Sequence, residues 1–282
     1  MSLAEKIERL YHQQTTDYGQ EFFDAFKELK QGLNSGEIRA AEPAPGELTG
    51  WKVNAWVKMG ILLGFRVGML EDMSASGDRG AFTSYDRNTD SLKDMDSESC
   101  VRDAPGGSSI RDGSYLGKGV VCMPPIFVNV GAYVDDGVMM DSRALVGSCA
   151  QVGKRVHVGA ASTIGGVLEP VGALPVIVED GVLIGGNCGL YEGVMVKQGA
   201  VLAAGTILTG STPVYDVVRG EVYRRAGDSP LVIPRDAIVV PGSRAVTSGP
   251  GKEWNISINT PVIVKYRDSK TDSSIRLEDL LR

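Results

Sequence analysis

Residues 127–146 read FVNVGAYVDDGVMMDSRALV, and a small apolar side chain returns in this stretch at every sixth position. The same spacing extends over much of the chain. It is kept by Ile110, Leu116, Cys122, Val128, Val134, Met140, Val146, Val152, Val158 and Ile164 and, after a gap, by Val178, Ile184, Leu190, Val196, Leu202, Leu208 and Val214. A period of six is typical of a parallel β-helix, in which three hexads form one triangular coil of about 18 residues.

Glycine recurs between the apolar positions, where a coil must turn a corner in little space and often with a positive φ. These glycines are Gly113, Gly119, Gly131, Gly137, Gly181, Gly193, Gly199 and Gly205. A single coil cannot bury its own core, so several must stack. The repeats imply roughly five to six coils.

Two stretches interrupt the repeat. Ile164 and Val178 are fourteen residues apart, two more than two hexads, so residues 165–175 are predicted to leave the wall as a loop. Residues 217–230 are predicted to form a second excursion, a hairpin. It carries Arg219, Glu221, Arg224 and Arg225. Insertions in solenoids commonly lie on one face, often the binding face.

The repeat divides the chain into three predicted parts: an N-terminal helical domain (1–100), the β-helix (101–247) and a C-terminal strand and helix extension (248–282). Apolar residues at helical spacing predict helices near residues 3–11 and 22–33, the second of them closed by Gly32 to Gly36. A third helix is predicted over Trp51–Leu63, followed by a polar loop at 74–96. Short strands are predicted at 233–234 and 239–241, a strand pair at 255–266 and a helix at 277–282.

Composition limits the partners of the protein. The net charge of −6 argues against nucleic acid as a main partner. No apolar run is long enough to span a bilayer, and the N-terminus shows no signal-peptide pattern, so no membrane partner is expected. The four cysteines form no CxxC pair, which favours structural thiols in the cytoplasm and no metal site.

Several stretches resemble the tetrahydrodipicolinate N-succinyltransferase family. They are Phe127 to Gly137, Val146 to Lys154, Gly165 to Pro170, Leu33 to Arg39, Trp56 to Lys58, Leu62 to Arg66, Val262 to Lys265 and Glu278 to Arg282. The likeness therefore covers nearly the whole chain. The hexads alone are shared by many acyltransferases, whereas the match in all three parts is more specific.

The resemblance implies a homotrimer of left-handed β-helices with active sites between neighbouring subunits. It also implies that succinyl-CoA lies along the coil wall. The amine of acyclic 2-amino-6-oxopimelate would then attack the thioester directly, as a step of lysine and diaminopimelate synthesis. Such acylation requires a neutral, oriented amine, a proton acceptor and donors for the oxyanion.

The resemblance assigns substrate roles to two residues. Asp141 matches the family's substrate-binding aspartate and is the catalytic candidate, although a corner aspartate that binds local backbone would give the same pattern. Arg102 matches an arginine that binds a substrate carboxylate, for which a guanidinium is well suited. An exposed linker arginine is the alternative explanation.

Further polar candidates surround these two. Arg143 replaces an aromatic residue of better-known members and is predicted to bind a carboxylate or to form a subunit-interface ion pair. Glu169, in the looped-out segment, and Glu192, in a coil, are acid–base or ion-pair candidates, and Glu169 is also predicted to bind substrate. His157 is one of two histidines and resembles the base of other hexapeptide acetyltransferases, but a neutral packing role explains it as well.

The chain departs from the family at Gly189, where the best-known catalytic acid aligns. This departure leaves the proton acceptor open. Gly166, Gly185, Ala204 and Gly205 are small wall residues against which the pantetheine arm of CoA could lie, although tight coil geometry explains them equally. No P-loop or GxGxxG motif is present to bind a nucleotide.

Three other functions compete with succinyl transfer. An acetyl-CoA-dependent N-acetyltransferase would share the loop at Gly166 to Val176, but that branch lacks the terminal domains. A related acylase for a specialised metabolite would fit Gly189 and Arg143. A non-catalytic β-helix would not need Arg102 and Asp141, and a carbonic anhydrase of this fold would need three zinc-binding histidines, whereas only His157 lies in the solenoid.

Overall fold

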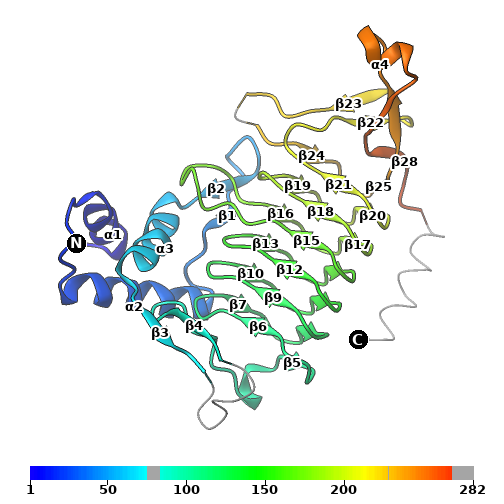
Figure 1. The fold of residues 1–282 in the computed structure, drawn as a ribbon. Helices are drawn as coiled ribbons and strands as arrows, with labels where there is room; N and C mark the ends of the chain where they lie inside the picture. Colours follow the sequence, from blue (N-terminus) through cyan, green and yellow to red (C-terminus); the bar gives the residue numbers. More distant parts are fainter. Residues whose placement is uncertain (75–82, 228, 269–282) are drawn as a thin grey trace.

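The middle of the chain forms a triangular solenoid with three walls of parallel strands (Figure 1). The computed structural model describes residues 1–74, 83–227 and 229–268. The first wall contains β7 (Tyr115–Leu116), β10 (Tyr133–Val134), β13 (Gln151–Val152), β16 (Ile177–Val178), β19 (Met195–Val196) and β24 (Val232–Ile233). The second contains β5 (Arg102–Asp103), β8 (Val121–Cys122), β11 (Met139–Met140), β14 (His157–Val158), β17 (Leu183–Ile184), β20 (Val201–Leu202) and β25 (Ala237–Val240). The third contains β6 (Ser109–Ile110), β9 (Phe127–Val128), β12 (Leu145–Val146), β15 (Thr163–Ile164), β18 (Gly189–Leu190) and β21 (Ile207–Leu208).

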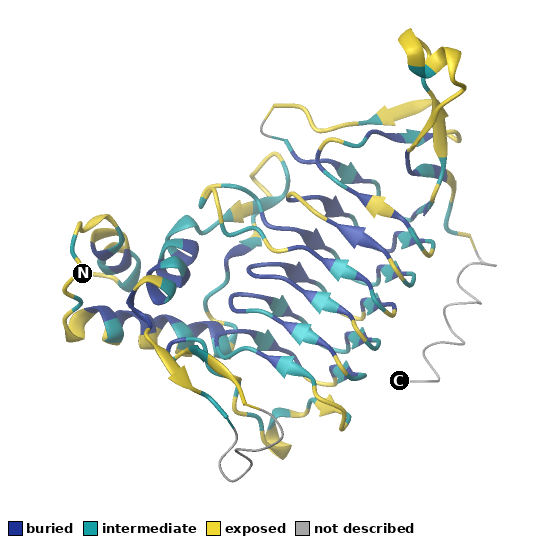
Figure 2. Ribbon diagram, viewed as in Figure 1, coloured by how far each residue is buried: buried dark blue, intermediate teal, exposed yellow. Residues whose placement is uncertain are grey.

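The six-residue spacing places one apolar side chain of each short strand in a continuous core. Tyr133 pairs with Tyr115 and Gln151, each eighteen residues away, so one coil is three hexads. Because the period along a strand is two, Val134 then points inward and Tyr133 outward. The inward residues form one buried cluster through the solenoid (Figure 2). The predicted hexapeptide-repeat β-helix is thus confirmed, and all eight predicted corner glycines have φ between 65° and 85°.

Both excursions leave the solenoid at the corner between the third and first walls. Gln151 pairs with Ile177, twenty-six residues on, so the first excursion adds eight residues to a coil of eighteen. The predicted loop at 165–175 is therefore confirmed. β15 and β16 are consecutive strands, so the chain advances by only one wall between them.

The second excursion is the predicted hairpin, formed by β22 (Val214–Asp216) and β23 (Glu221–Tyr223). Met195 pairs with Val232, thirty-seven residues on, so this excursion adds nineteen residues to a coil. It starts at Val214, earlier than predicted, and the Val214 side chain remains buried in the solenoid core. The strands predicted at 233–234 and 239–241 correspond to β24 and β25.

Helices cover the first wall of the solenoid (Figure 1). They are α1 (Leu3–His12), α2 (Gln20–Ser35) and α3 (Ala55–Val67). Their apolar faces share a core with Val130 and Cys149 of the solenoid. Gly36, with φ of 77°, ends α2 in the left-handed conformation expected of a helix C-cap.

Two predictions for this region need correction. The helix predicted over Trp51–Leu63 begins later, because β2 (Trp51–Val53) pairs with β1 (Ala41–Pro43) in an antiparallel hairpin and this pairing replaces helical hydrogen bonds. The polar stretch predicted as a loop contains part of a second small hairpin, β3 (Leu70–Asp72) with β4 (Tyr85–Arg87), before the 3-10 helix η1 (Ser97–Ser99).

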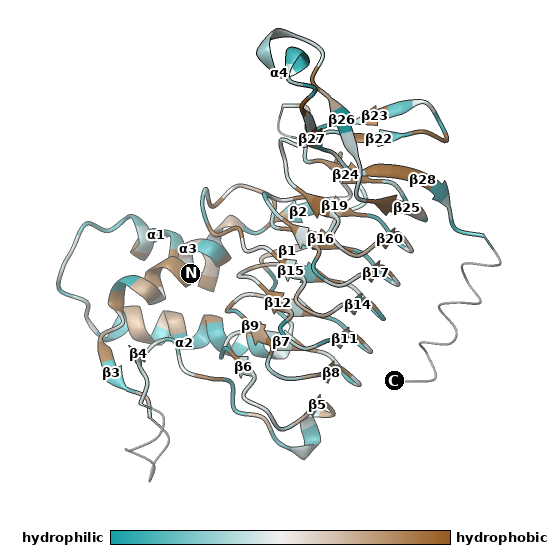
Figure 3. Cartoon of the chain, turned by 45° about the vertical axis from the view of Figure 1, so that its right-hand side comes forward, coloured by the Kyte–Doolittle hydropathy of each residue, from teal (hydrophilic) through white to brown (hydrophobic). Residues whose placement is uncertain are grey.

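The C-terminal strands extend past the last coils (Figure 3). These elements are β26 (Ser243–Ala245), α4 (Gly249–Glu253), β27 (Ser257–Asn259) and β28 (Val262–Tyr266). The predicted pairing within 255–266 is wrong, because β27 pairs with β26 whereas β28 pairs with β25 and β22. The helix predicted at 277–282 lies outside the described residues. Across the described ranges, no helix combines the length and the apolar character needed to cross a membrane.

Candidate active site

Asp141 lies at the corner between the second and third walls, and a ridge of small residues follows it along this corner. Met140, Val158, Ile184 and Leu202 pair in register on successive coils. The residues that follow them therefore stack along the corner. We call residues 159–161, 185–186 and 203–205, which are glycine or alanine, the small-residue ridge.

Coil packing explains part of this ridge. A Cβ atom on Gly159 would lie 2.6 Å from the Ile184 carbonyl oxygen, and one on Gly185 would lie 2.6 Å from the Ala204 nitrogen. Neither position can accept a side chain without moving backbone. Ala204 is exposed, so the ridge presents a smooth surface along which a linear ligand can lie.

Asp141 is hydrogen-bonded to His157. The Asp141 Oδ2 atom lies 3.0 Å from the His157 Nε2 atom, and the side chains are 31% and 15% exposed, respectively. His157 starts β14, which pairs directly with β11, so the coil stacking brings the two together. The carboxylate is the more exposed member of the pair, and its hydrogen bond to the more buried imidazole restrains it.

Arg143 lies at the same corner, two residues after Asp141. It is exposed and has φ of 66°, and the equivalent residues on the next two coils, Ala161 and Asn187, are also left-handed, with φ of 57° and 56°. Its backbone nitrogen donates to the Pro125 carbonyl at 2.6 Å, which fixes the corner conformation. A side chain in the left-handed region is unfavourable for a non-glycine residue. The corner thus carries an exposed arginine two residues after Asp141 at this cost.

Arg102 lies on the second wall but not beside Asp141. It is exposed on β5, and β8 separates β5 from β11. Two strand spacings amount to roughly 10 Å. Within one chain the predicted carboxylate-binding arginine and the predicted catalytic aspartate therefore share a wall without touching.

Glu169 and Gly166 lie at a different corner. They belong to the 165–175 loop, which leaves between the third and first walls, whereas Asp141 follows the second wall. Glu169 is exposed, and a Cβ atom on Gly166 would lie 2.7 Å from the Ser148 nitrogen. The structure thus divides the predicted site residues between two corners of the solenoid.

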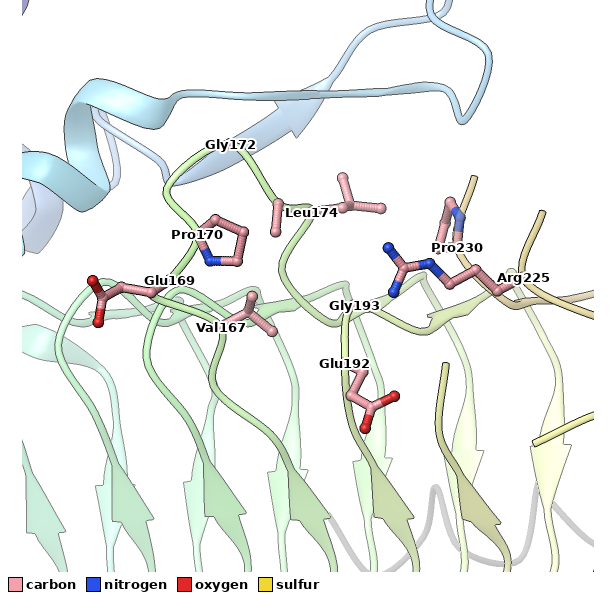
Figure 4. Close-up of a pocket in the computed structure, with 10 residues that line it drawn as sticks. Val167, Glu169, Pro170, Gly172, Leu174, Glu192, Gly193, Arg225 and Pro230 are labelled. Carbon is pink, nitrogen blue, oxygen red and sulfur yellow. The ribbon is translucent and has the colours of Figure 1, made fainter. Parts of the chain in front are cut away.

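The loop and the hairpin enclose a cavity of about 500 Å³. Figure 4 shows Val167, Pro170 and Leu174 of the loop facing Arg225 of the hairpin, while the Glu169 carboxylate points away from Arg225. A second cavity of about 410 Å³ adjoins it and shares Glu192 and Arg225. The Glu192 Oε2 atom accepts a hydrogen bond from the Gly210 nitrogen at 2.9 Å, so this acid partly serves the backbone.

A buried carboxylate holds the hairpin in place. Asp216 of β22 accepts a hydrogen bond from the Tyr266 hydroxyl at 2.7 Å and from the backbone nitrogens of Val218 and Arg219. These contacts tie the hairpin to β28 and so fix the segment that carries Arg224 and Arg225.

Tyr191 occupies the space next to Gly189. A Cβ atom on Gly189 would lie 2.5 Å from the Tyr191 Cε2 atom, so a larger side chain there would displace the ring. The predicted departure from the family at Gly189 is therefore accompanied by an aromatic ring over the same part of the third wall. Sequence reasoning noted the glycine and missed the tyrosine, although Tyr191 lies only two residues away.

The buried cysteines have a packing role. Burial raises the pKa of the Cys149 and Cys122 thiols to about 12, so neither is an accessible thiolate at neutral pH. Cys188 is also buried, and its pKa is raised by burial. Within the described ranges, no three His, Cys, Asp or Glu side chains gather as a metal ion would require.

Comparison with known proteins identifies the family. The profile described as "Tetrahydrodipicolinate N-succinyltransferase N-terminal" matches residues 2–67, and "Hexapeptide repeat of succinyl-transferase" matches residues 175–210. The 2,3,4,5-tetrahydropyridine-2,6-dicarboxylate N-succinyltransferase of Acinetobacter baylyi is 39% identical over 259 residues, which cover 92% of this chain and 89% of the relative. The chain belongs to this family. The enzyme of the same name from Bradyrhizobium diazoefficiens is 42% identical over 267 residues, which cover 92% of this chain and 89% of that relative.

Membership in the tetrahydrodipicolinate N-succinyltransferase family confirms the resemblance drawn from the quoted motifs and makes the chain a CoA-dependent acyltransferase. A hexapeptide-repeat acetyltransferase of Vibrio cholerae, solved with acetyl coenzyme A, superposes with a TM-score of 0.35 and 17% identity, covering 54% of this chain and 71% of that one. That score is too low to add to the assignment, which rests on the sequence relatives.

Proposed function

We propose that this chain transfers the succinyl group of succinyl-CoA to the amine of tetrahydrodipicolinate, in its acyclic form 2-amino-6-oxopimelate, for lysine and diaminopimelate synthesis. The observation that carries the proposal is the identity of about 40% with N-succinyltransferases over 92% of the chain. The likeness includes the N-terminal helices, beyond the widely shared hexads.

The Asp141–His157 pair supplies the base. Asp141, the more exposed of the two, accepts a hydrogen bond from the substrate amine, and the imidazole of His157 keeps the carboxylate oriented. As the amine nitrogen bonds to the thioester carbon, its proton passes to the pair. The C–S bond then breaks, and the leaving CoA thiolate takes up the proton. The products are the N-succinyl amide and CoA thiol.

The small-residue ridge supports the pantetheine arm of succinyl-CoA. Gly185, Ala204 and Gly205 lie on this ridge above Asp141, so a thioester carried along it can reach the carboxylate. Gly166 lies at the other corner, and its predicted contact with CoA requires a second subunit. The donor assignment itself comes from the names of the relatives.

A homotrimer of left-handed β-helices joins the two corners. The loop corner of one subunit, with Gly166 and Glu169, faces the ridge corner of its neighbour, with Asp141 and Arg143. The support is that these groups do not meet within one chain. In this arrangement Arg102 and Arg143 bind substrate carboxylates. We expect light scattering to give three times the chain mass of 30.0 kDa, and a monomer at assay concentration would contradict the shared site.

The three-domain division at residues 100 and 247, with residues 248–282 as an extension, is part of the same proposal. Its support is that the helices precede the first coil strand and that β26 to β28 follow the last coil. A location in the cytoplasm and the lack of nucleic-acid and membrane partners stay predictions.

The test follows CoA thiol release with tetrahydrodipicolinate and either succinyl-CoA or acetyl-CoA, with each donor alone as the background. We expect faster release with succinyl-CoA. Faster release with acetyl-CoA would replace the donor assignment by an N-acetyltransferase, and no release with either donor would contradict the proposal.

The ring of Tyr191 over Gly189 favours a second candidate, the acylation of a related amino dicarboxylate for a specialised metabolite. A panel of such acceptors, compared by kcat/KM with succinyl-CoA held constant, separates the two. A related acceptor that exceeds tetrahydrodipicolinate tenfold or more in kcat/KM would establish the second candidate, since that ratio corresponds to about 1.4 kcal/mol of transition-state discrimination.

A further inference from the structure

Lys58 is a fully buried lysine that touches the 165–175 loop from outside the solenoid. It lies on α3, its exposed fraction is 0%, and its Nζ atom donates a hydrogen bond to the Ala173 carbonyl oxygen at 2.6 Å. No carboxylate of the described residues pairs with it. Burial lowers the pKa of Lys58, because the charged form has lost its water.

This placement is unfavourable for packing alone. A buried ammonium loses its hydration and regains little from a single carbonyl. A methionine of similar length would fill the same space without that cost. What a methionine lacks is the directional hydrogen bond, so the bond to Ala173 is the feature that distinguishes lysine at this position.

The loop has few other hydrogen bonds. Gly165 donates its backbone N–H to the Leu190 carbonyl at 2.7 Å, Val167 to the Ser148 carbonyl at 3.2 Å, and Ala173 to the Pro170 carbonyl at 2.9 Å. The Val167 side chain packs against the solenoid core. Leu168 packs on the core of the N-terminal helices, and Leu174 packs against a cluster that includes Trp51. Among the described residues, Lys58 is the only one whose side chain hydrogen-bonds to the loop.

The same loop forms one side of the cavity of about 500 Å³, and Ala173 itself lines it. Opposite the loop lies Arg225, as Figure 4 shows. A shift of the Ala173 carbonyl would therefore move the cavity wall. The hydrogen bond from Lys58 is a physical link between the N-terminal helices and this wall.

We propose that Lys58 is a positioning residue for the acyl-transfer site: its ammonium fixes the Ala173 carbonyl and holds the 165–175 loop in the shape that forms the cavity. The N-terminal helices then serve the reaction through this contact, in addition to covering the first wall. The catalytic part of this inference rests on the proposed function, whereas the anchoring part does not.

Lys58→Met removes the hydrogen bond and keeps most of the side-chain volume. Lys30→Met is the matched control, because Lys30 also joins the N-terminal helices to the solenoid, through Asp112, but does not touch the loop. Lys58→Arg keeps a cationic donor and tests for partial rescue. Hydrogen exchange of amides 167–174 by mass spectrometry, melting temperature, and KM and kcat with succinyl-CoA are measured on the intact enzyme.

Loss of a hydrogen bond made by a charged group is expected to change an equilibrium that depends on it by about tenfold. In Lys58→Met we expect hydrogen exchange of the loop amides to become about tenfold faster. We expect KM for succinyl-CoA to rise by a similar factor, with kcat changed less. We expect Lys58→Arg to move both values back toward wild type. Lys30→Met should lower the melting temperature without changing loop exchange or KM.

The proposal would be overturned if the loop amides of Lys58→Met exchanged at the wild-type rate. It would also be overturned if Lys30→Met changed loop exchange and KM as much as Lys58→Met does. If Lys58→Met does not fold, Lys58→Arg carries the same readouts: it retains a donor for the Ala173 carbonyl, so loop exchange and KM should stay near wild type, and an increase of about tenfold in either would contradict the hydrogen bond as the anchor. Wild-type protein that releases no thiol with any donor would defeat the proposed function alone, since loop exchange would still decide the anchoring role.

Discussion

The Nε2 atom of His157 lies 3.0 Å from the Oδ2 atom of Asp141, although sixteen residues separate them along the chain. Direct pairing of β11 with β14 creates this proximity. The carboxylate is twice as exposed as the imidazole, with values of 31% and 15%. The aspartate is therefore the more accessible member, which is why the proposed mechanism gives it the contact with the substrate amine.

Asp141→Asn should lower kcat by roughly 100-fold or more, the range that general base catalysis contributes. The amide keeps the shape of the carboxylate and cannot accept the proton. His157→Gln should reduce kcat less, because it removes only the group that orients the carboxylate. Thiol release under saturating succinyl-CoA measures both effects, with melting temperature as the folding control.

The double variant tests whether the pair acts as a unit. Residues that act together give non-additive losses, so Asp141→Asn with His157→Gln should be no slower than the more damaged single variant. Fully additive losses would show that the two side chains act independently and would contradict the pairing mechanism.

Arg143 combines an exposed side chain, two residues after Asp141, with a left-handed backbone, φ of 66°. Arg143→Ala and Arg143→Gly both remove the guanidinium, and we expect both to raise KM for the amino dicarboxylate. Only the glycine variant relieves the backbone, so it should be more stable than the alanine variant by about 1 kcal/mol. Urea unfolding measures this difference. Equal stabilities would show that the corner relaxes in the alanine variant.

Ala204 is an exposed residue of the small-residue ridge. Ala204→Phe should leave folding intact and raise KM for succinyl-CoA by about tenfold, because a bulky ring on the ridge would cost contacts worth about 1.4 kcal/mol. Ala204→Ser is the matched control and should retain the wild-type KM. An unchanged KM in Ala204→Phe would remove this part of the ridge from the CoA path.

Asp112 should make stability depend on acid pH. Burial raises its pKa, but hydrogen bonds from Lys30 and Asn34 and the positive charges of Lys30 and Lys93 outweigh burial, so the pKa is lowered from 3.8. Its stabilising contribution is complete above the unfolded value of 3.8 and is lost as pH falls through the lower folded pKa.

Urea unfolding of wild type and Asp112→Asn between pH 7 and pH 2 provides the measurement. The variant should be less stable at neutral pH by roughly 1–3 kcal/mol, because partly buried Lys30 loses its partner. The difference should shrink toward pH 2. A difference that stays constant across the range would contradict a lowered pKa for Asp112.

The local pattern was sufficient to predict the coils. A six-residue apolar period with glycine at the corners is compatible with few backbones, and each inward residue meets its equivalents on adjacent coils. Predictions were wrong where a strand pairs with a segment outside its own local pattern: Trp51–Val53 pairs with Ala41–Pro43 instead of starting a helix, and Val262–Tyr266 pairs with Ala237–Val240.

The amino-acid sequence by itself determined the β-helix, the positions of its two excursions and the family, because these depend on short-range periodicity and on motifs. Only the tertiary structure decided which polar groups meet. It paired Asp141 with His157, separated both from Glu169, and buried Lys58 under the Ala173 carbonyl. The physical reason is that each of these contacts joins different coils or joins a helix to a loop, so it depends on how the strands stack and how α3 packs, which a local pattern does not specify.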